Sequence, residues 1–258
     1  MLDLSLSGRT AVVCGSSQGL GEASAVALAS QGANLVCIAR NKEMLDSVVT
    51  GLVGERHQFF ICDFEKREQV ENIAKQLSDM NIDILVNNAG GPPPNPATQS
   101  SDADYLSAFQ MHLLTAATLS NAVIPKMKEQ QWGRIVNIVS VSGKTPVANL
   151  AVSNSVRGAV INWSKTLSNE VASHGITVNC VLPGYTRTSR LEQLNTLAAQ
   201  RTGKTKQEVE SGIIAQIPMG RFGRPEEIAA AVAFYSAPAS SFVTGTCLPV
   251  DGGWTKFS

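Results

Sequence analysis

The chain has 258 residues, of which 43% are hydrophobic and 16% are charged, so it can bury a full core and is not a disordered segment. Lysine plus arginine equals aspartate plus glutamate at 21 each, and this balance excludes a long-range attraction to nucleic acid or to an anionic membrane. No apolar run is long enough to span a membrane, and the first residues lack the basic and apolar regions of a signal peptide.

Short apolar runs alternate with amphipathic segments along the chain. The runs that read as strands are 9–15, 34–40, 57–64, 82–90, 133–140, 176–184 and 245–253. The segments between them that read as helices are 19–32, 42–53, 67–80, 102–129, 152–173 and 225–235. This alternation predicts an α/β fold, a doubly wound, Rossmann-like parallel sheet with helices on both faces. We expect a single domain over residues 1–258.

One irregular stretch, 185–223, is polar and helix-prone and follows a predicted strand. We interpret it as an insertion that forms a lid over a substrate site. It contains Arg187, Arg190 and Arg201, which could read an acidic substrate or the phosphopantetheine of a carrier, or could form a solvated face.

The cysteines are scattered, mostly in apolar runs, and no pair has CxxC or metal-ligand spacing: they are Cys14, Cys37, Cys62, Cys180 and Cys247. An odd count in such surroundings is typical of reduced core thiols in a cytoplasmic protein. We therefore expect neither disulfides nor a metal site.

The first predicted strand leads directly into the glycine-rich segment CGSSQGLGEA at 14–23, which opens a helix. Gly15, Gly19 and Gly21 let backbone N–H groups approach a pyrophosphate at the helix N-terminus. A glycine-rich turn that binds nothing is the alternative. With NNAG at 87–90, and with GRIVNIVS, ITVNCVLPG, GRFGRPEEIA and GTCLPVDGG further along, the chain resembles the classical short-chain dehydrogenases/reductases over nearly its whole length. The resemblance is nearest to 3-oxoacyl-acyl-carrier-protein reductases.

The expected cofactor follows from the end of the second predicted strand, where an acidic residue would select NAD. This chain has Ala39 and Arg40 there, so nothing repels a 2′-phosphate and a guanidinium can bind it. We expect NADP, with NAD less favoured, although Gln18 stands where many NADP-dependent relatives have a basic residue. The resemblance implies cofactor contacts from Gly15, Ser17, Gln18, Gly19, Leu20, Gly21, Ala39, Arg40, Asp63, Phe64, Asn88, Ala89, Gly90, Arg157, Pro183, Gly184, Thr186 and Thr188.

The catalytic positions depart from the family pattern, which uses asparagine, serine, tyrosine and lysine to deliver a proton to the reduced carbonyl. Ser140 retains the serine position. Ser153 and Arg157 stand where the tyrosine and the lysine are usual, and His112 aligns with the asparagine. The sequence thus keeps one of the family's catalytic side chains and changes the others.

These replacements leave the proton donor open. Ser153 is too weak an acid to replace a phenol, and Arg157 can bind ribose hydroxyls but will not release a proton. His112, which ordinarily titrates near neutrality, and Tyr185, at the start of the lid, are the two candidate donors. Each could instead be structural, His112 through a hydrogen bond and Tyr185 through packing. The space left by the missing phenol must be filled by water, by substrate, or by Tyr185 or His112.

We expect a cytoplasmic NADP-dependent oxidoreductase with a non-standard catalytic site, acting on a small-molecule or acyl-carrier-linked carbonyl or hydroxyl. The alternatives are a dinucleotide-binding sensor or scaffold that has lost catalysis, or a dehydration or isomerisation in the same cleft. No nucleic acid or membrane partner is expected. The segments 105–119 and 158–167 carry more apolar residues than one helix face needs, which favours a homo-oligomer, either a dimer or a tetramer.

Overall fold

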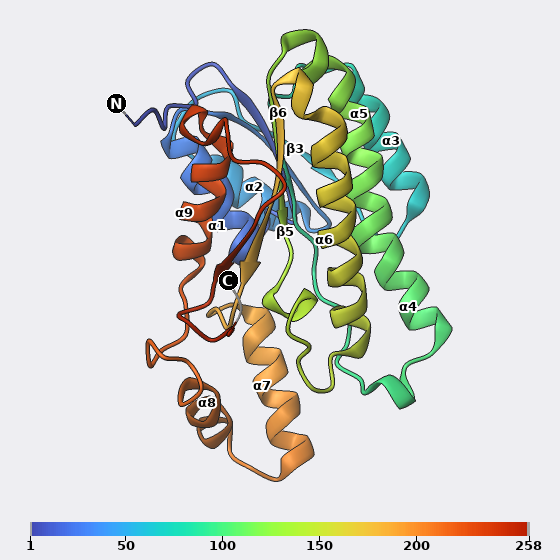
Figure 1. Cartoon of the computed structure of the whole chain (residues 1–258), viewed down its shortest axis with the longest axis vertical. Coiled ribbons are helices and arrows are strands. Elements are labelled where there is room, and N and C mark those ends of the chain that lie inside the picture. Colours follow the sequence, from blue (N-terminus) through green and yellow to red (C-terminus); the bar gives the residue numbers. More distant parts are fainter. Residues whose placement is uncertain (1, 257–258) are drawn as a thin grey trace.

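The computed structural model describes residues 2–256 and arranges them as a parallel sheet between two layers of helices (Figure 1). The strands are β1 (Thr10–Cys14), β2 (Asn34–Ala39), β3 (Gln58–Ile61), β4 (Ile84–Asn87), β5 (Gly133–Ile138), β6 (Ile176–Pro183) and β7 (Cys247–Val250). They lie in the order β3-β2-β1-β4-β5-β6-β7, and all neighbours are parallel. The strand order reverses between β1 and β4, where ligands bind in such sheets. The predicted doubly wound fold is confirmed.

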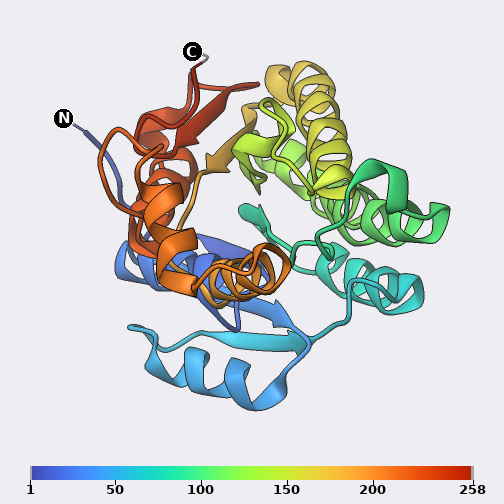
Figure 2. The same ribbon diagram turned by 90° about the horizontal axis from the view of Figure 1, so that it is seen from below.

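The helices form one layer on each face of the sheet (Figures 1 and 2). One layer contains α1 (Gly19–Ser30), α2 (Lys42–Gly51) and α9 (Pro225–Ser236). The other contains α3 (Arg67–Ser78), α5 (Thr115–Gln130) and α6 (Ala151–Val171), with α4 (Asp102–Phe109) packed against α6.

Strand β1 shows why the strand sequences are apolar throughout. Ala11 and Val13 pack in the core beside α1 and α9, whereas Val12 and Cys14 pack in the core beside α3 and α5. Successive side chains of a strand point to opposite faces, so a strand covered on both faces buries every residue.

The predicted helix at 102–129 is helical throughout, but its hydrogen-bonding pattern changes in the middle. Helix α4 ends at Phe109, a π-helical turn spans Gln110–Leu114, and α5 begins at Thr115. The Thr115 hydroxyl donates to the Gln110 carbonyl at 2.9 Å, which supports the wider turn. The turn places the His112 side chain in the interior.

The predicted lid at 185–223 contains two helices, α7 (Ser189–Thr202) and α8 (Lys206–Ile214). Its two ends are joined, because the Arg187 amide donates to the Gly223 carbonyl at 2.9 Å and the Gly223 amide to the Tyr185 carbonyl at 2.9 Å. Viewed from below, α7 and α8 lie over the carboxyl ends of the central strands (Figure 2).

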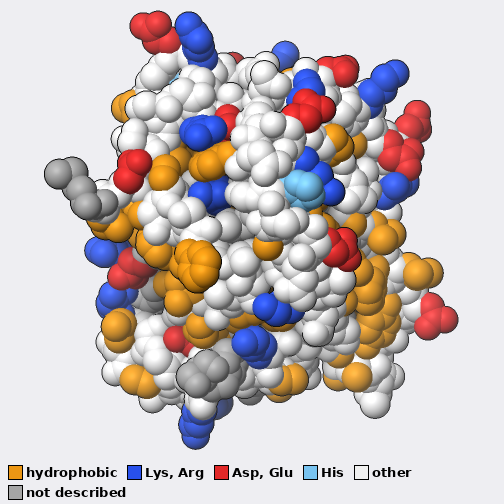
Figure 3. Space-filling model, turned by 45° about the horizontal axis from the view of Figure 1, so that its top comes forward, with side chains coloured by type: hydrophobic (Ala, Val, Ile, Leu, Met, Phe, Trp, Pro, Cys, Tyr) orange, Lys and Arg blue, Asp and Glu red, His pale blue; other side chains and the backbone are white. Residues whose placement is uncertain are grey.

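The face seen in Figure 3 carries charges of both signs, with no large patch of either. Hydrophobic side chains gather on the right of that view, the side on which α4 to α6 lie in Figure 1. Leu106 and Leu114, on α4 and the π-helical turn, are 70% and 45% exposed. Among residues 2–256, no helix has the length and apolar character that a membrane crossing requires.

Candidate active site

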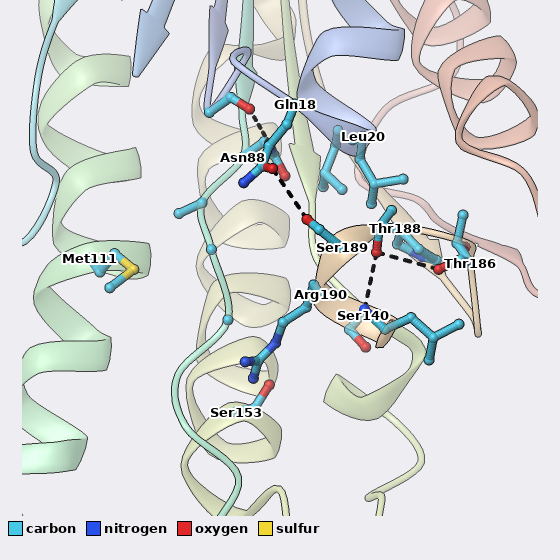
Figure 4. Close-up of a pocket in the computed structure, with 18 of the residues that line it drawn as sticks. Gln18, Leu20, Asn88, Met111, Ser140, Ser153, Thr186, Thr188, Ser189 and Arg190 are labelled. Atoms are coloured by element: carbon cyan, nitrogen blue, oxygen red, sulfur yellow. Dashed lines mark hydrogen bonds between the residues drawn. The ribbon is translucent and has the colours of Figure 1, made fainter. Parts of the chain in front are cut away.

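A cleft of about 660 Å³ opens at the carboxyl ends of the central strands, beneath α7 (Figure 4). The glycine-rich turn after β1 forms one wall, and the segment after β6 together with α7 forms the opposite wall. Of the cofactor residues expected from sequence, all line this cleft except Gly21, which lies beneath the turn. Of the expected catalytic residues, Ser140, Ser153, Arg157 and Tyr185 line it, and His112 does not.

The glycine-rich turn has the shape that a pyrophosphate requires. Gly15 and Gly19 each have a φ of 61°, which favours glycine. A Cβ on Gly21 would lie 2.1 Å from the Gly15 carbonyl oxygen, so the turn and α1 can pack this closely only without a side chain there. Gln18 makes no side-chain cap on α1, which leaves the first-turn N–H groups directed at the cleft. The turn therefore fits a dinucleotide phosphate.

The adenosine end of the cleft contains Ala39, Arg40 and Asp63. The Arg40 side chain is 69% exposed, and its nearest Nη lies 4.0 Å from Asp63 Oδ1, so the guanidinium is held only weakly and is accessible to a phosphate. Asn41 and Met44 also line this end, and the sequence analysis did not include them. The only feature of the sequence that could have identified them as cleft residues is that they follow Arg40 closely.

The reacting end is built by two elements. Ser140 follows β5, and its Oγ accepts from the Ser142 amide at 3.1 Å, which fixes the hydroxyl at the cleft wall. Ser153 and Arg157 lie one turn apart on α6, so both side chains project from the same face of the helix into the cleft. These three residues were predicted from the sequence to lie together, and all three line the cleft.

Arg157 is a buried cation with few partners. Its side chain is buried, and Nη1 donates to the Ile138 carbonyl at 3.0 Å, while Nε has no partner among the described residues. Burial, and secondarily the nearby Arg190, lower the pKa of Arg157 to about 10. It remains a cation at neutral pH and does not serve as a proton donor.

His112 lies behind the cleft wall, in a small adjoining pocket that it shares with Asn87 and Arg157. Its Nε2, Arg157 Nε and Asn87 Oδ1 are all buried without a hydrogen-bond partner in the described part of the chain. Burial and the Arg157 charge lower the pKa of His112 well below its ordinary value. The ring is therefore neutral at pH 7, contrary to the expectation that it titrates near neutrality.

Tyr185 lines the cleft and also packs in the lid. Its ring meets Trp254 edge-on, with centroids 5.5 Å apart, in a cluster with Leu191 and Phe222. Burial raises the pKa of Tyr185, so its phenol keeps its proton at neutral pH. The position of Tyr185 is therefore compatible with both proposed roles, packing in the protein and donating a proton in the cleft.

Segment 185–223 also reaches across the cleft to the glycine-rich turn. Ser189 Oγ donates to Gln18 Oε1 at 3.2 Å, and Thr188 caps α7 by accepting from the Leu191 amide at 3.3 Å (Figure 4). Arg190 Nη2 donates to the Pro92 carbonyl, and its guanidinium reaches from α7 toward Ser153 (Figure 4). The side chain that points at Ser153, where the family has its tyrosine, is thus Arg190, whereas Tyr185 and His112 were expected there from the sequence. In the described residues, no three metal-ligating side chains converge.

Comparisons with known proteins identify the family to which the chain belongs. A family model described as enoyl-(acyl carrier protein) reductase matches residues 15–255. The 3-oxoacyl-[acyl-carrier-protein] reductase of Haemophilus influenzae is 33% identical, over 96% of this chain and 98% of that protein. The NADPH-dependent reductase BacG of Bacillus subtilis is 32% identical, over 97% of this chain and 99% of its own.

Solved structures of reductases are also similar to this chain. The NADPH-dependent reductase YwfH, involved in bacilysin biosynthesis, superimposes with a TM-score of 0.91 at 32% identity, covering 98% of this chain and 100% of that one. L-sorbose reductase of Gluconobacter frateurii, complexed with NADPH and L-sorbose, has a TM-score of 0.93 at 28% identity, covering 99% and 100%. The fold and the cleft are those of a nucleotide-binding oxidoreductase. The chain belongs to the short-chain dehydrogenase/reductase family.

Proposed function

We propose that this protein is an NADP(H)-dependent oxidoreductase acting on a carbonyl or hydroxyl group, related to 3-oxoacyl-acyl-carrier-protein reductases but with a different catalytic set. The proposal rests on one observation: the glycine-rich turn, Arg40 and the group formed by Ser140, Ser153 and Arg157 all line the same cleft. The use of NADPH by related reductases, and NADP bound in similar structures, supports the cofactor.

When bound, NADPH would supply a hydride to the carbonyl carbon and leave as NADP⁺. Its phosphates would lie at the glycine-rich turn, its 2′-phosphate at Arg40 and its nicotinamide ribose at Arg157. The Ser140 hydroxyl would donate a hydrogen bond to the carbonyl oxygen, and the nearby guanidinium charge would stabilise the negative oxygen as it forms. One proton added to that oxygen completes the alcohol.

Arg40 should determine the choice of cofactor. We expect NADPH to bind at least about tenfold more tightly than NADH, because a charge-assisted bond to the 2′-phosphate is worth about 1.5–3 kcal/mol. Arg40→Ala should remove most of this difference, and Ala39→Asp should reverse it by repelling the phosphate. Fluorescence titration with both cofactors measures the effect, and equal affinities in the unmodified protein would contradict the assignment.

Tyr185 is the proposed proton donor, because it lines the cleft whereas His112 lies behind it. Tyr185→Phe keeps the ring against Trp254 and removes only the hydroxyl. Turnover should fall about 100-fold or more while NADPH binding is unchanged, as expected for loss of a general acid. Unaltered turnover would assign the proton to water, and loss of binding would indicate a packing role.

A dinucleotide sensor without catalysis is the second candidate, and one feature favours it. None of these three groups at the reacting end has its pKa moved close to 7. The pKa of Arg157 is about 10, burial raises the pKa of Tyr185, and burial lowers that of His112. A protein that binds NADPH but oxidises it with no member of a panel of ketones and 3-oxoacyl thioesters would support the sensor.

The apolar side of α4–α6 supports the proposal of a homo-oligomer, a dimer or tetramer. We propose that the protein acts in the cytoplasm, on a small-molecule or carrier-linked carbonyl.

A further inference from the structure

Two arginine side chains line the reacting end of the cleft, with no acidic residue of the described chain between them. Arg157 enters from α6 and Arg190 from α7, and they are close enough for the charge of Arg190 to lower the pKa of Arg157. Bringing two like charges together inside a protein costs free energy unless an anion compensates them.

The described residues, 2–256, provide no such anion. Neither arginine forms an ion pair with a carboxylate anywhere in residues 2–256. The acidic residues that line the cleft are Asp63 and Glu65, and both lie at the adenosine end beside Arg40. A ribose has hydroxyl groups but no charge, so a nicotinamide ribose at Arg157 would leave the charge of Arg190 uncompensated.

Arg190 is held in place rather than free in solvent. Its Nη2 donates to the Pro92 carbonyl, and its guanidinium packs against Gly91, where an added Cβ would lie 3.2 Å from Arg190 Nε. Burial lowers the pKa of Arg190. The group is thus anchored at one edge, with the remaining N–H groups beside Ser153 (Figure 4). A planar fork held in this way suits a carboxylate.

We propose that the cleft takes a small oxo acid or hydroxy acid, whose carboxylate binds Arg190 while its carbonyl lies at Ser140. This inference rests on the proposed function and specifies its substrate class. The charge must lie within a few bonds of the carbonyl, because Arg190 points at the reacting end. A carrier-linked thioester has no charge there, since its phosphate lies at the far end of a long arm. The structure therefore favours a free acid over a carrier-linked substrate.

The other two arginines of the lid do not share this position. Arg187 is exposed, does not line the cleft and stacks over Phe222 at 5.6 Å. Arg201 is exposed at the far end of α7 and also lies outside the cleft. Arg187→Gln is therefore a matched control that removes the same charge from the same segment.

The activity test compares 3-oxobutanoate with its methyl ester in the NADPH-loaded protein. We expect kcat/KM for the acid to exceed that for the ester by about 100-fold, because the ester leaves the half-buried charge of Arg190 without a counter-anion. Arg190→Gln should lower the value for the acid by about 100-fold and change that for the ester by less than about threefold. Arg190→Lys should recover part of the loss, and Arg187→Gln should match the native protein.

A binding test keeps the inference separate from the proposed function. Malonate, which cannot be reduced, should raise the melting temperature of the native NADPH complex, and dimethyl malonate should not. The shift should disappear in Arg190→Gln and persist in Arg187→Gln. If nothing is reduced but malonate binds through Arg190, the proposed activity fails and the acid site stands. An ester reduced as well as the acid, or no malonate shift in the native complex, would overturn the inference.

Discussion

Replacing Ser153 by tyrosine and Arg157 by lysine together should raise the reduction of a 3-oxoacyl or diketone substrate by about 100-fold, the usual contribution of a general acid. Both positions lie on one face of α6 and line the cleft beside Ser140. A tyrosine at 153 would supply a phenol where the native chain has a weakly acidic hydroxyl. A lysine at 157 would lower the pKa of that phenol. Neither single change should do as well.

The position of Arg190 refines this expectation. Its guanidinium is directed at Ser153, so a new phenol must share that space (Figure 4). Adding Arg190→Gln to the double variant should increase its rate on an uncharged diketone further. Ser155→Tyr with Arg157→Lys is the control, because Ser155 is exposed on another face of the same helix. A folded, NADPH-binding double variant that stays inactive would mean that the assigned geometry of this helix turn is wrong.

Replacing Arg157 by methionine should stabilise the protein without cofactor and weaken NADPH binding. The native guanidinium is buried, is adjacent to Arg190, and has one hydrogen bond, to the Ile138 carbonyl. Replacing such a buried charge by an apolar side chain of similar size is often stabilising, here by about 1 kcal/mol, or a rise in Tm of about 2–4 °C. Loss of a charged hydrogen bond to ribose should lower NADPH affinity about tenfold or more.

The opposite signs of these two effects distinguish a binding residue from a structural one. Functional sites commonly retain such groups at a cost in stability. Calorimetry of the cofactor-free protein and fluorescence titration with NADPH measure both quantities on the same sample, with Arg157→Lys as the charge-conserving control. A lower Tm with unchanged NADPH affinity would show that Arg157 serves the fold alone.

Much of the architecture could be predicted because each signal is local. Strands buried on both faces must be apolar throughout, and the glycine-rich turn identifies the first strand–helix unit. The π-helical turn at Gln110–Leu114 could not be predicted, since neither glycine nor proline marks it. The wider turn depends on a hydrogen bond from Thr115 and on burial of His112, which only the folded chain provides.

The same limit applies to the site. The motifs located Ser140, Ser153 and Arg157, because these positions are fixed relative to flanking family segments. The role of Arg190 could not be separated from those of Arg187 and Arg201 in a polar stretch. Only the docking of α7 over the cleft brings Arg190 to the Pro92 carbonyl and leaves the other two arginines outside. The buried position of His112 likewise depends on neighbours distant in sequence, including Arg157 and Asn87.

The central claim, that this altered site still transfers a hydride from NADPH, is tested most directly by isotope transfer. The protein is loaded with NADPH carrying deuterium on both C4 positions and is mixed with 3-oxobutanoate and a panel of related ketones in ordinary water. Mass spectrometry of the product then reports whether the cofactor's deuterium is bound to the former carbonyl carbon. We expect one deuterium per molecule of product, with one NADPH oxidised for each. Intact, fully deuterated NADPH recovered from the bound complex after prolonged incubation with the whole panel would contradict it.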